Sequence, residues 1–172
     1  MSGRTWADPY RAVIRQFNRA GIRYVVVGMA GINYYARGPS ETFATLDYDI
    51  LLEPTLRNVA RAVGCLSRLG FALGTATGLF REEALRQLVR DQRTLVATTP
   101  DGLSVELLLK VSGYAFSELA NDAATFTIRG VPARVGRLTK LLHSKKLAGR
   151  PKDLQFLRRY ESLLEEEPAP PA

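Results

Sequence analysis

The chain has 172 residues and a mass of 19.0 kDa, which corresponds to one domain of ordinary size. Apolar residues make up 46% of the chain and charged residues 24%, so it can bury a core, and disordered and fibrous proteins are excluded. The longest stretch without a charge spans residues 24–36 and is shorter than the roughly 20 residues that cross a bilayer. We therefore expect no membrane-spanning helix.

The charge balance favours anionic partners. The 24 basic and 17 acidic residues give a net charge of +7, and 19 of the basic residues are arginine. Such an excess suits nucleotides or nucleic acid, although arginines spread over a solvated surface would give the same balance. The N-terminal residues show no secretory signal, and Cys65 is the only cysteine, which excludes an internal disulfide and predicts a cytoplasmic location.

Helices and strands alternate along the first half of the chain. Apolar residues at helical spacing and short β-branched runs predict these elements. They are a helix over residues 10–20, a strand over 22–27, a short helix over 29–37, a loop at 38–40, a strand over 46–52, and a helix between Thr55 and Gly70.

The second half adds strands and ends in helices. Residues 71–80 are ambiguous, and the other expected elements are a helix over 82–90, a hairpin of strands 94–98 and 103–109, strands over 125–128 and 131–135, and helices over 138–147 and 152–164. The acidic, proline-rich tail 165–172 is expected to be disordered. We predict a single domain over residues 1–164 of the α+β (α/β-like) class, with a mixed sheet flanked by helices and short C-terminal helices.

Two aspartates on the second expected strand carry the strongest functional signal. Asp47 and Asp49 are two residues apart, so on a strand they point to the same face. Neighbouring carboxylates repel unless one is protonated or a cation bridges them, and Mg²⁺ prefers carboxylate and phosphate oxygens. The alternative is a solvent-facing strand edge, where charges prevent aggregation.

Gly28 and Glu106 could complete such a site. Gly28 joins a strand to a helix, where backbone N–H groups can bind a phosphate, although a plain turn also explains a glycine there. Glu106 alternates with Val105 and Leu107, so it projects away from the core. If its strand lies beside that of the aspartates, Glu106 can act as a third metal ligand or as a general base. A lone acid on such a strand also commonly faces water.

The order of these residues resembles a known family. Gly28 followed by Asp47-x-Asp49 and a later strand carboxylate is similar to the small bacterial nucleotidyltransferases of the DNA polymerase beta superfamily, of the minimal or abortive-infection toxin-antitoxin type. The segment KKLAGRPKD at residues 145–153 resembles the Lys-x-x-Ala-Gly-Arg-x-Lys-Asp stretch of that group. The resemblance covers approximately residues 10–160.

The resemblance implies a fold, a reaction and a set of site residues. The reaction is transfer of a nucleoside monophosphate from an NTP such as ATP to a hydroxyl of RNA, protein or a small molecule, with Mg²⁺ as cofactor and a partner toxin or antitoxin protein. The implied catalytic residues and metal ligands are Asp47, Asp49 and Glu106, and the implied nucleotide contacts are Gly28, Met29, Thr45 and Lys145.

Differences from the family keep other interpretations open. The family usually has Gly or Ser at the position of Met29, Arg at that of Phe43, and Asp at that of Glu106. A second hypothesis is therefore an inactive nucleotidyltransferase fold that binds RNA or a partner protein, and a third is a metabolite-binding domain with surface aspartates. His143 is the sole histidine and has no cysteine near it in the sequence, which argues against zinc. Tyr34 and Tyr35 either stack on a nucleobase or pack in the core.

Overall fold

The strands of the protein join into one mixed sheet. The computed structural model describes residues 6–38, 41–43, 45 and 47–166. Within these residues eight strands follow the order β4-β3-β5-β6-β2-β1-β8-β7. Pairs β1/β8 and β2/β6 are parallel, and the other neighbours are antiparallel. The strands are β1 Tyr24–Val26, β2 Tyr48–Leu52, β3 Ala72–Thr75, β4 Gly78–Leu79, β5 Leu95–Thr98, β6 Ser104–Leu108, β7 Ala124–Ile128 and β8 Val131–Val135.

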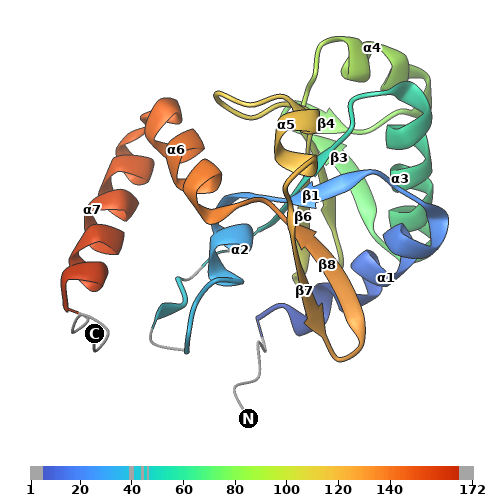
Figure 1. The fold of residues 1–172 in the computed structure, drawn as a ribbon. Coiled ribbons are helices and arrows are strands. Elements are labelled where there is room, and N and C mark those ends of the chain that lie inside the picture. The colour runs from blue at the N-terminus through green and yellow to red at the C-terminus, as the bar shows by residue number, and fades with distance from the viewer. Residues whose placement is uncertain (1–5, 39–40, 44, 46, 167–172) are drawn as a thin grey trace.

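Helices cover both sides of this sheet. Helices α1 and α3 lie on one side, and α2, α6 and α7 lie on the other (Figure 1). The helices are η1 Asp8–Tyr10, α1 Arg11–Ala20, α2 Gly28–Asn33, α3 Leu56–Arg68, η3 Glu82–Ala84, α4 Leu85–Arg90, α5 Phe116–Ala120, α6 Leu138–Ala148 and α7 Pro151–Glu166. The predicted α+β class is confirmed. In the described part of the chain, no helix combines the length and apolar character needed to cross a membrane.

Aromatic contacts show which face of β2 each side chain uses. The ring of Tyr48 stacks on that of Tyr10, just before α1, with 4.5 Å between centroids and 19° between planes. Tyr48 therefore points toward the side that α1 covers. Because side chains alternate along a strand, Asp49 points to the opposite side. Strand β2 thus has an apolar face against the core and a face that presents carboxylates.

Several predicted boundaries differ from those in the structure. Strand β2 begins at Tyr48, so Asp47 stands just before it, and α7 continues to Glu166, two residues into the tail that we expected to be disordered. Residues 167–172 of that tail lie outside the described residues. The ambiguous segment 71–80 forms the short strands β3 and β4 at the sheet edge, and α5 was not predicted because five residues give little periodic signal.

The predicted helix over residues 29–37 ends early, at Asn33, for a visible reason. The Asn33 side chain is buried and pairs with the backbone of Phe43, donating Nδ2–H to the carbonyl at 2.9 Å and accepting the Phe43 N–H at 2.9 Å. The Phe43 ring in turn lies edge-on to Phe156 of α7, with 4.6 Å between centroids. Phe43 therefore anchors α7 to the loop that precedes Asp47.

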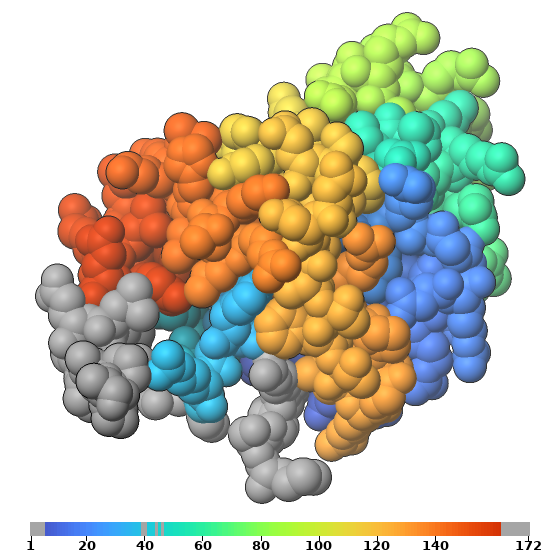
Figure 2. Space-filling model, viewed as in Figure 1, coloured from blue at the N-terminus to red at the C-terminus, as the bar shows by residue number. Residues whose placement is uncertain are grey.

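The space-filling view shows the same arrangement as a surface. Helices α6 and α7, in orange and red, lie at one end, and α1 and α3, in blue and teal, lie at the other (Figure 2). The core between them is continuous and contains most of the large apolar side chains, including Phe17, Ile50 and Leu107.

Candidate active site

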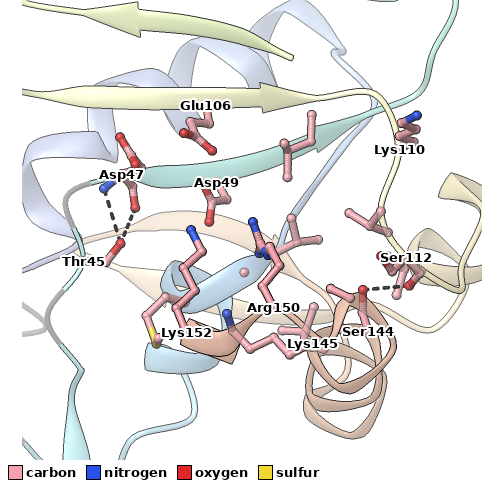
Figure 3. A pocket seen from close by; sticks show the side chains of 18 residues that line it. Thr45, Asp47, Asp49, Glu106, Lys110, Ser112, Ser144, Lys145, Arg150 and Lys152 are labelled. Atoms are coloured by element: carbon pink, nitrogen blue, oxygen red, sulfur yellow. Dashed lines mark hydrogen bonds between the residues drawn. The ribbon is translucent and has the colours of Figure 1, made fainter. Parts of the chain in front are cut away.

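One cavity collects all of the predicted site residues. It has a volume of about 750 Å³ and lies between the start of α2, strands β2 and β6, and helices α6 and α7. Its walls include residues predicted from the sequence and further cationic side chains (Figure 3). The predicted residues are Gly28, Met29, Thr45, Asp47, Asp49, Glu106 and Lys145, and the further cations are Lys110, Arg150 and Lys152.

Three carboxylates converge in this cavity because of the strand pairing. Asp49 on β2 and Glu106 on β6 are direct partners in the parallel register, which places their backbones about 5 Å apart on one sheet face. Asp47 precedes Asp49 by two residues and lines the same cavity. The strand of Glu106 therefore lies beside the strand of the aspartates, as the predicted three-carboxylate site requires.

The carboxylates are close enough to disturb each other's ionisation. Burial, followed by the nearby Glu106 and Asp47 carboxylates, raises the pKa of Asp49 to about 8. Burial and the Asp47 charge also raise the pKa of Glu106. Oδ1 of Asp49 is buried and has no hydrogen-bond partner in the structure. Burial and repulsion among the three carboxylates therefore favour the protonated form of Asp49 in the metal-free protein.

Gly28 is required by the position of Asp49. Its φ is +62°, in the left-handed region that favours glycine. A Cβ atom at this position would lie 2.2 Å from Oδ2 of Asp49, far inside van der Waals contact. The N–H of the preceding Val27 donates to the Asp49 carbonyl at 3.0 Å. Glycine thus makes room for a carboxylate, which is a different reason from the phosphate approach inferred from the sequence.

Two hydroxyl groups fix Asp47. Ser104 Oγ donates to Asp47 Oδ1 at 2.7 Å. Thr45 Oγ1 donates to the Asp47 carbonyl at 2.9 Å and accepts the Asp47 N–H at 3.3 Å (Figure 3). Thr45 was predicted as a nucleotide contact, and it lines the cavity while holding the backbone of Asp47. Ser104 was missed, although its position two residues before Glu106 on one strand places both on the same face.

Cations from the C-terminal helices face the carboxylates across the cavity. Arg150 and Lys152 extend toward them, and Lys145 lies along the opposite wall of the cavity (Figure 3). Asp153, only 1% exposed, holds two of these cations, with 3.3 Å from its Oδ1 to Lys145 Nζ and 2.6 Å from its Oδ2 to Arg150 Nε. Burial acts to raise the pKa of Asp153, but the hydrogen bonds and charges of Arg150 and Lys145 outweigh it and lower the pKa.

The structure decides between interpretations of the tyrosines and the histidine. Tyr34 is 2% exposed and its hydroxyl lies 2.5 Å from that of Tyr48, while Tyr35 donates its hydroxyl to the Gly136 carbonyl at 2.7 Å. Neither tyrosine lines the cavity, so the packing interpretation is confirmed. His143 is exposed and shares a hydrogen bond of 2.7 Å with the Tyr114 hydroxyl, as expected of a surface or packing residue.

The donor chemistry of the carboxylate cluster suits a divalent cation. Mg²⁺ prefers oxygen ligands, and it would compensate the repulsion that raises the pKa of Asp49 and give its unpartnered Oδ1 a contact. Among the residues that the structure describes, no three His, Cys, Asp or Glu side chains already stand in an ion-binding arrangement. The fit therefore rests on the chemistry and charge of Asp47, Asp49 and Glu106 rather than on preformed coordination.

Comparisons with known proteins find similar structures at low sequence identity. No family model and no curated protein matches the chain. The chain resembles the crystal structure of JHP933 from Helicobacter pylori with a TM-score of 0.48 and 14% identity, over 88% of this chain and 62% of that one. It resembles a candidate nucleotidyltransferase from H. pylori with a TM-score of 0.43 and 13% identity, over 82% of this chain and 56% of that one. The chain thus spans less than two thirds of each of these proteins.

Proposed function

We propose that the protein is a Mg²⁺-dependent nucleotidyltransferase that moves a nucleoside monophosphate from an NTP to a hydroxyl acceptor. The observation that carries the proposal is the cavity in which Asp47, Asp49 and Glu106 face Lys145 and its neighbouring cations. A site for a metal-bound triphosphate needs both signs of charge, because carboxylates hold the metal and cations hold the phosphates. A volume of about 750 Å³ also falls in the usual range for a small-molecule site.

Each side chain has a role in this reaction. Asp47, Asp49 and Glu106 would hold Mg²⁺, which when bound neutralises phosphate charge and polarises the reacting phosphorus. Lys145 and Arg150 donate to the triphosphate, and Asp153 keeps both in place.

The transfer exchanges one bond to the α-phosphorus for another and releases one proton. The acceptor oxygen forms a bond to the α-phosphorus while the bond from that phosphorus to the bridging oxygen breaks, and pyrophosphate leaves with the electron pair. Glu106, which lines the cavity beside Asp49, accepts the proton of the attacking hydroxyl. The remaining contribution of the protein is to position the reactants and exclude competing water.

The proposal is tested by thermal unfolding with and without NTP and Mg²⁺. A ligand that binds only the folded state raises the melting temperature, so an NTP should stabilise the protein only when Mg²⁺ is present. Asp49→Asn should abolish this effect, whereas Asp91→Asn, which removes an exposed carboxylate directly after α4, should leave it intact. Metal-dependent stabilisation by NTP in Asp49→Asn would contradict the assignment.

A second hypothesis is an inactive nucleotidyltransferase fold that binds RNA or a partner protein. Met29, where the resembled family has a small residue, lines the cavity and reduces the space near Gly28. If Mg²⁺ and NTP bind but none of the four radiolabelled NTPs transfers its label to RNA, protein or small hydroxyl compounds, this hypothesis replaces the first. The identity of the acceptor and a partner toxin or antitoxin stay predictions.

A further inference from the structure

Six arginines lie on two adjacent helices that take no part in the cavity. Arg11, Arg15 and Arg19 on α1 recur every four residues and so share one face of that helix. Helix α3 carries a second row at positions 57, 61 and 68, and spacings of four and seven residues also keep these side chains on one helix face. We call these six residues the arginine surface, and they are Arg11, Arg15, Arg19, Arg57, Arg61 and Arg68.

The two rows form one surface. Helices α1 and α3 pack against each other on the same side of the sheet (Figure 1). The guanidinium group of Arg61 reaches across to donate a hydrogen bond to the carbonyl of Ala20, the last residue of α1. The side chains between the arginines on the exposed faces are small or neutral, including Ala12, Asn18 and Ala60. The surface is therefore positively charged and has no bulky side chains that would keep a partner at a distance.

The positive charge of this surface is not compensated. Neither helix contains an Asp or a Glu. The nearest acids along the chain, Asp8 and Glu53, already pair with Arg129 and Arg23. In the part of the chain that the structure describes, no carboxylate pairs with any of the six guanidinium groups. Arg61 and Arg68 make hydrogen bonds within the fold, to the Ala20 carbonyl and to Cys65 Sγ. No such contact within the described residues accounts for the other four arginines.

The surface lies on the opposite side of the sheet from the cavity. Tyr48 points toward α1 and stacks on Tyr10, whereas its neighbours Asp47 and Asp49 line the cavity. A partner on the arginine surface would therefore leave the cavity open to NTP and metal.

We propose that the arginine surface binds the phosphate backbone of a double-helical nucleic acid. The guanidinium group donates two parallel hydrogen bonds to a phosphate and keeps its charge at all physiological pH values, so a row of arginines suits a repeated phosphate ligand. This inference rests on α1 and α3 and is independent of the proposed function, although it also gives that function a means of holding an RNA acceptor.

The composition of the surface favours a duplex over other anionic partners. Among the described residues, the large apolar side chains that are exposed are Leu79, Leu147 and Leu154, and none lies on α1 or α3. A helix that binds a membrane surface needs such side chains to insert. Single-stranded nucleic acid is commonly held by exposed aromatic rings that stack on bases, and the exposed positions of α1 and α3 include none. Backbone contacts alone suit a duplex.

The test is fluorescence anisotropy with the full chain and a short labelled DNA duplex across a series of salt concentrations. Each neutralised phosphate contributes about −0.9 to the slope of log affinity against log salt, so six arginines predict a slope of up to about −5. The variant R15Q/R19Q/R57Q removes three arginines whose side chains make no hydrogen bond or ion pair with another described residue. It should reduce the magnitude of the slope by about 3 and weaken binding at low salt at least about tenfold.

Matched variants separate the surface from net charge and from folding. The variant R86Q/R90Q/R93Q removes the same charge from a segment that also contains Glu82, Glu83 and Asp91, and it should keep the slope. The variant R15K/R19K/R57K keeps the charge and should also keep the slope. The first triple variant should retain the wild-type melting temperature. Asp49→Asn should bind the duplex as the wild type does, so failure of the nucleotide site and failure of this surface are distinguishable.

Four outcomes would overturn the proposal. The first is equal loss of binding in both glutamine variants, which would show that net charge alone attracts the duplex. The second is no duplex binding at low salt. The third is tighter binding of a single strand than of the duplex. The fourth is arginine-dependent binding to phosphatidylserine vesicles without binding to the duplex.

Discussion

The substitution Asp49→Asn should stabilise the metal-free protein, and increasingly so as the pH rises. The pKa of Asp49 is about 8 in the folded protein, because burial and the Glu106 and Asp47 carboxylates disfavour its charged form, against 3.8 ordinarily. The folded state therefore holds a proton that the unfolded state releases, so stability is highest below about pH 4 and is lost as the pH rises through about 8. Asparagine has the same shape and does not ionise.

The change in the free energy of unfolding with pH has an upper limit, because one proton is released at Asp49. One proton changes the unfolding free energy by at most about 1.4 kcal/mol per pH unit, or about 4 kcal/mol from about pH 5 to about pH 8. We expect about 2 kcal/mol, because Glu106, whose pKa is also raised, takes up part of the proton.

The assay is urea unfolding followed by circular dichroism in EDTA, for the wild type and Asp49→Asn at several pH values. The difference in unfolding free energy should grow with pH up to about 8 and then level off. Asp91→Asn, which alters an exposed carboxylate, should show no such trend. Parallel pH profiles for the wild type and Asp49→Asn would contradict this prediction, because they would show that Asp49 ionises without penalty in the fold.

Three further substitutions test the parts that support the site. Gly28→Ala should destabilise the protein by at least about 1 kcal/mol in urea unfolding, because φ is positive and the new Cβ would collide with Asp49, and Mg²⁺ should no longer promote NTP binding. Asp153→Asn should weaken Mg²⁺-NTP binding in calorimetry about tenfold or more, because its two cations lose the buried carboxylate that positions them; unchanged affinity would exclude that role. Phe43→Ala should lower the unfolding free energy by about 3 kcal/mol through lost packing against α7, and an effect under about 1 kcal/mol would contradict this coupling.

The strand pattern made the carboxylate cluster predictable. Alternation places Asp47 and Asp49 on one face, and it places Glu106 opposite the buried Val105 and Leu107. The remaining step, which strand lies beside which, cannot be read from spacing alone. The parallel pairing of β2 with β6 fixed it, and this pairing joins residues more than fifty positions apart.

Other parts of the site depend on contacts that leave little trace in the sequence. Asp153 ends the segment that resembles the family stretch, but its role is not evident from the sequence, because only the packing of α6 against α7 buries it between Lys145 and Arg150. The role of Phe43 is also not evident from the sequence, because its ring packs against Phe156 of α7, more than one hundred positions away. Short elements such as α5 were missed because five residues do not complete two helical turns.

Equilibrium dialysis with a radiolabelled NTP, in Mg²⁺ or in EDTA, tests most directly whether the carboxylate cluster and its facing cations form a metal-nucleotide site. We expect one bound NTP per wild-type chain in Mg²⁺ and little bound NTP in EDTA. For Asp49→Asn we expect little bound NTP in either condition. Equal NTP binding by the wild type and Asp49→Asn, or equal binding with and without Mg²⁺, would contradict this expectation.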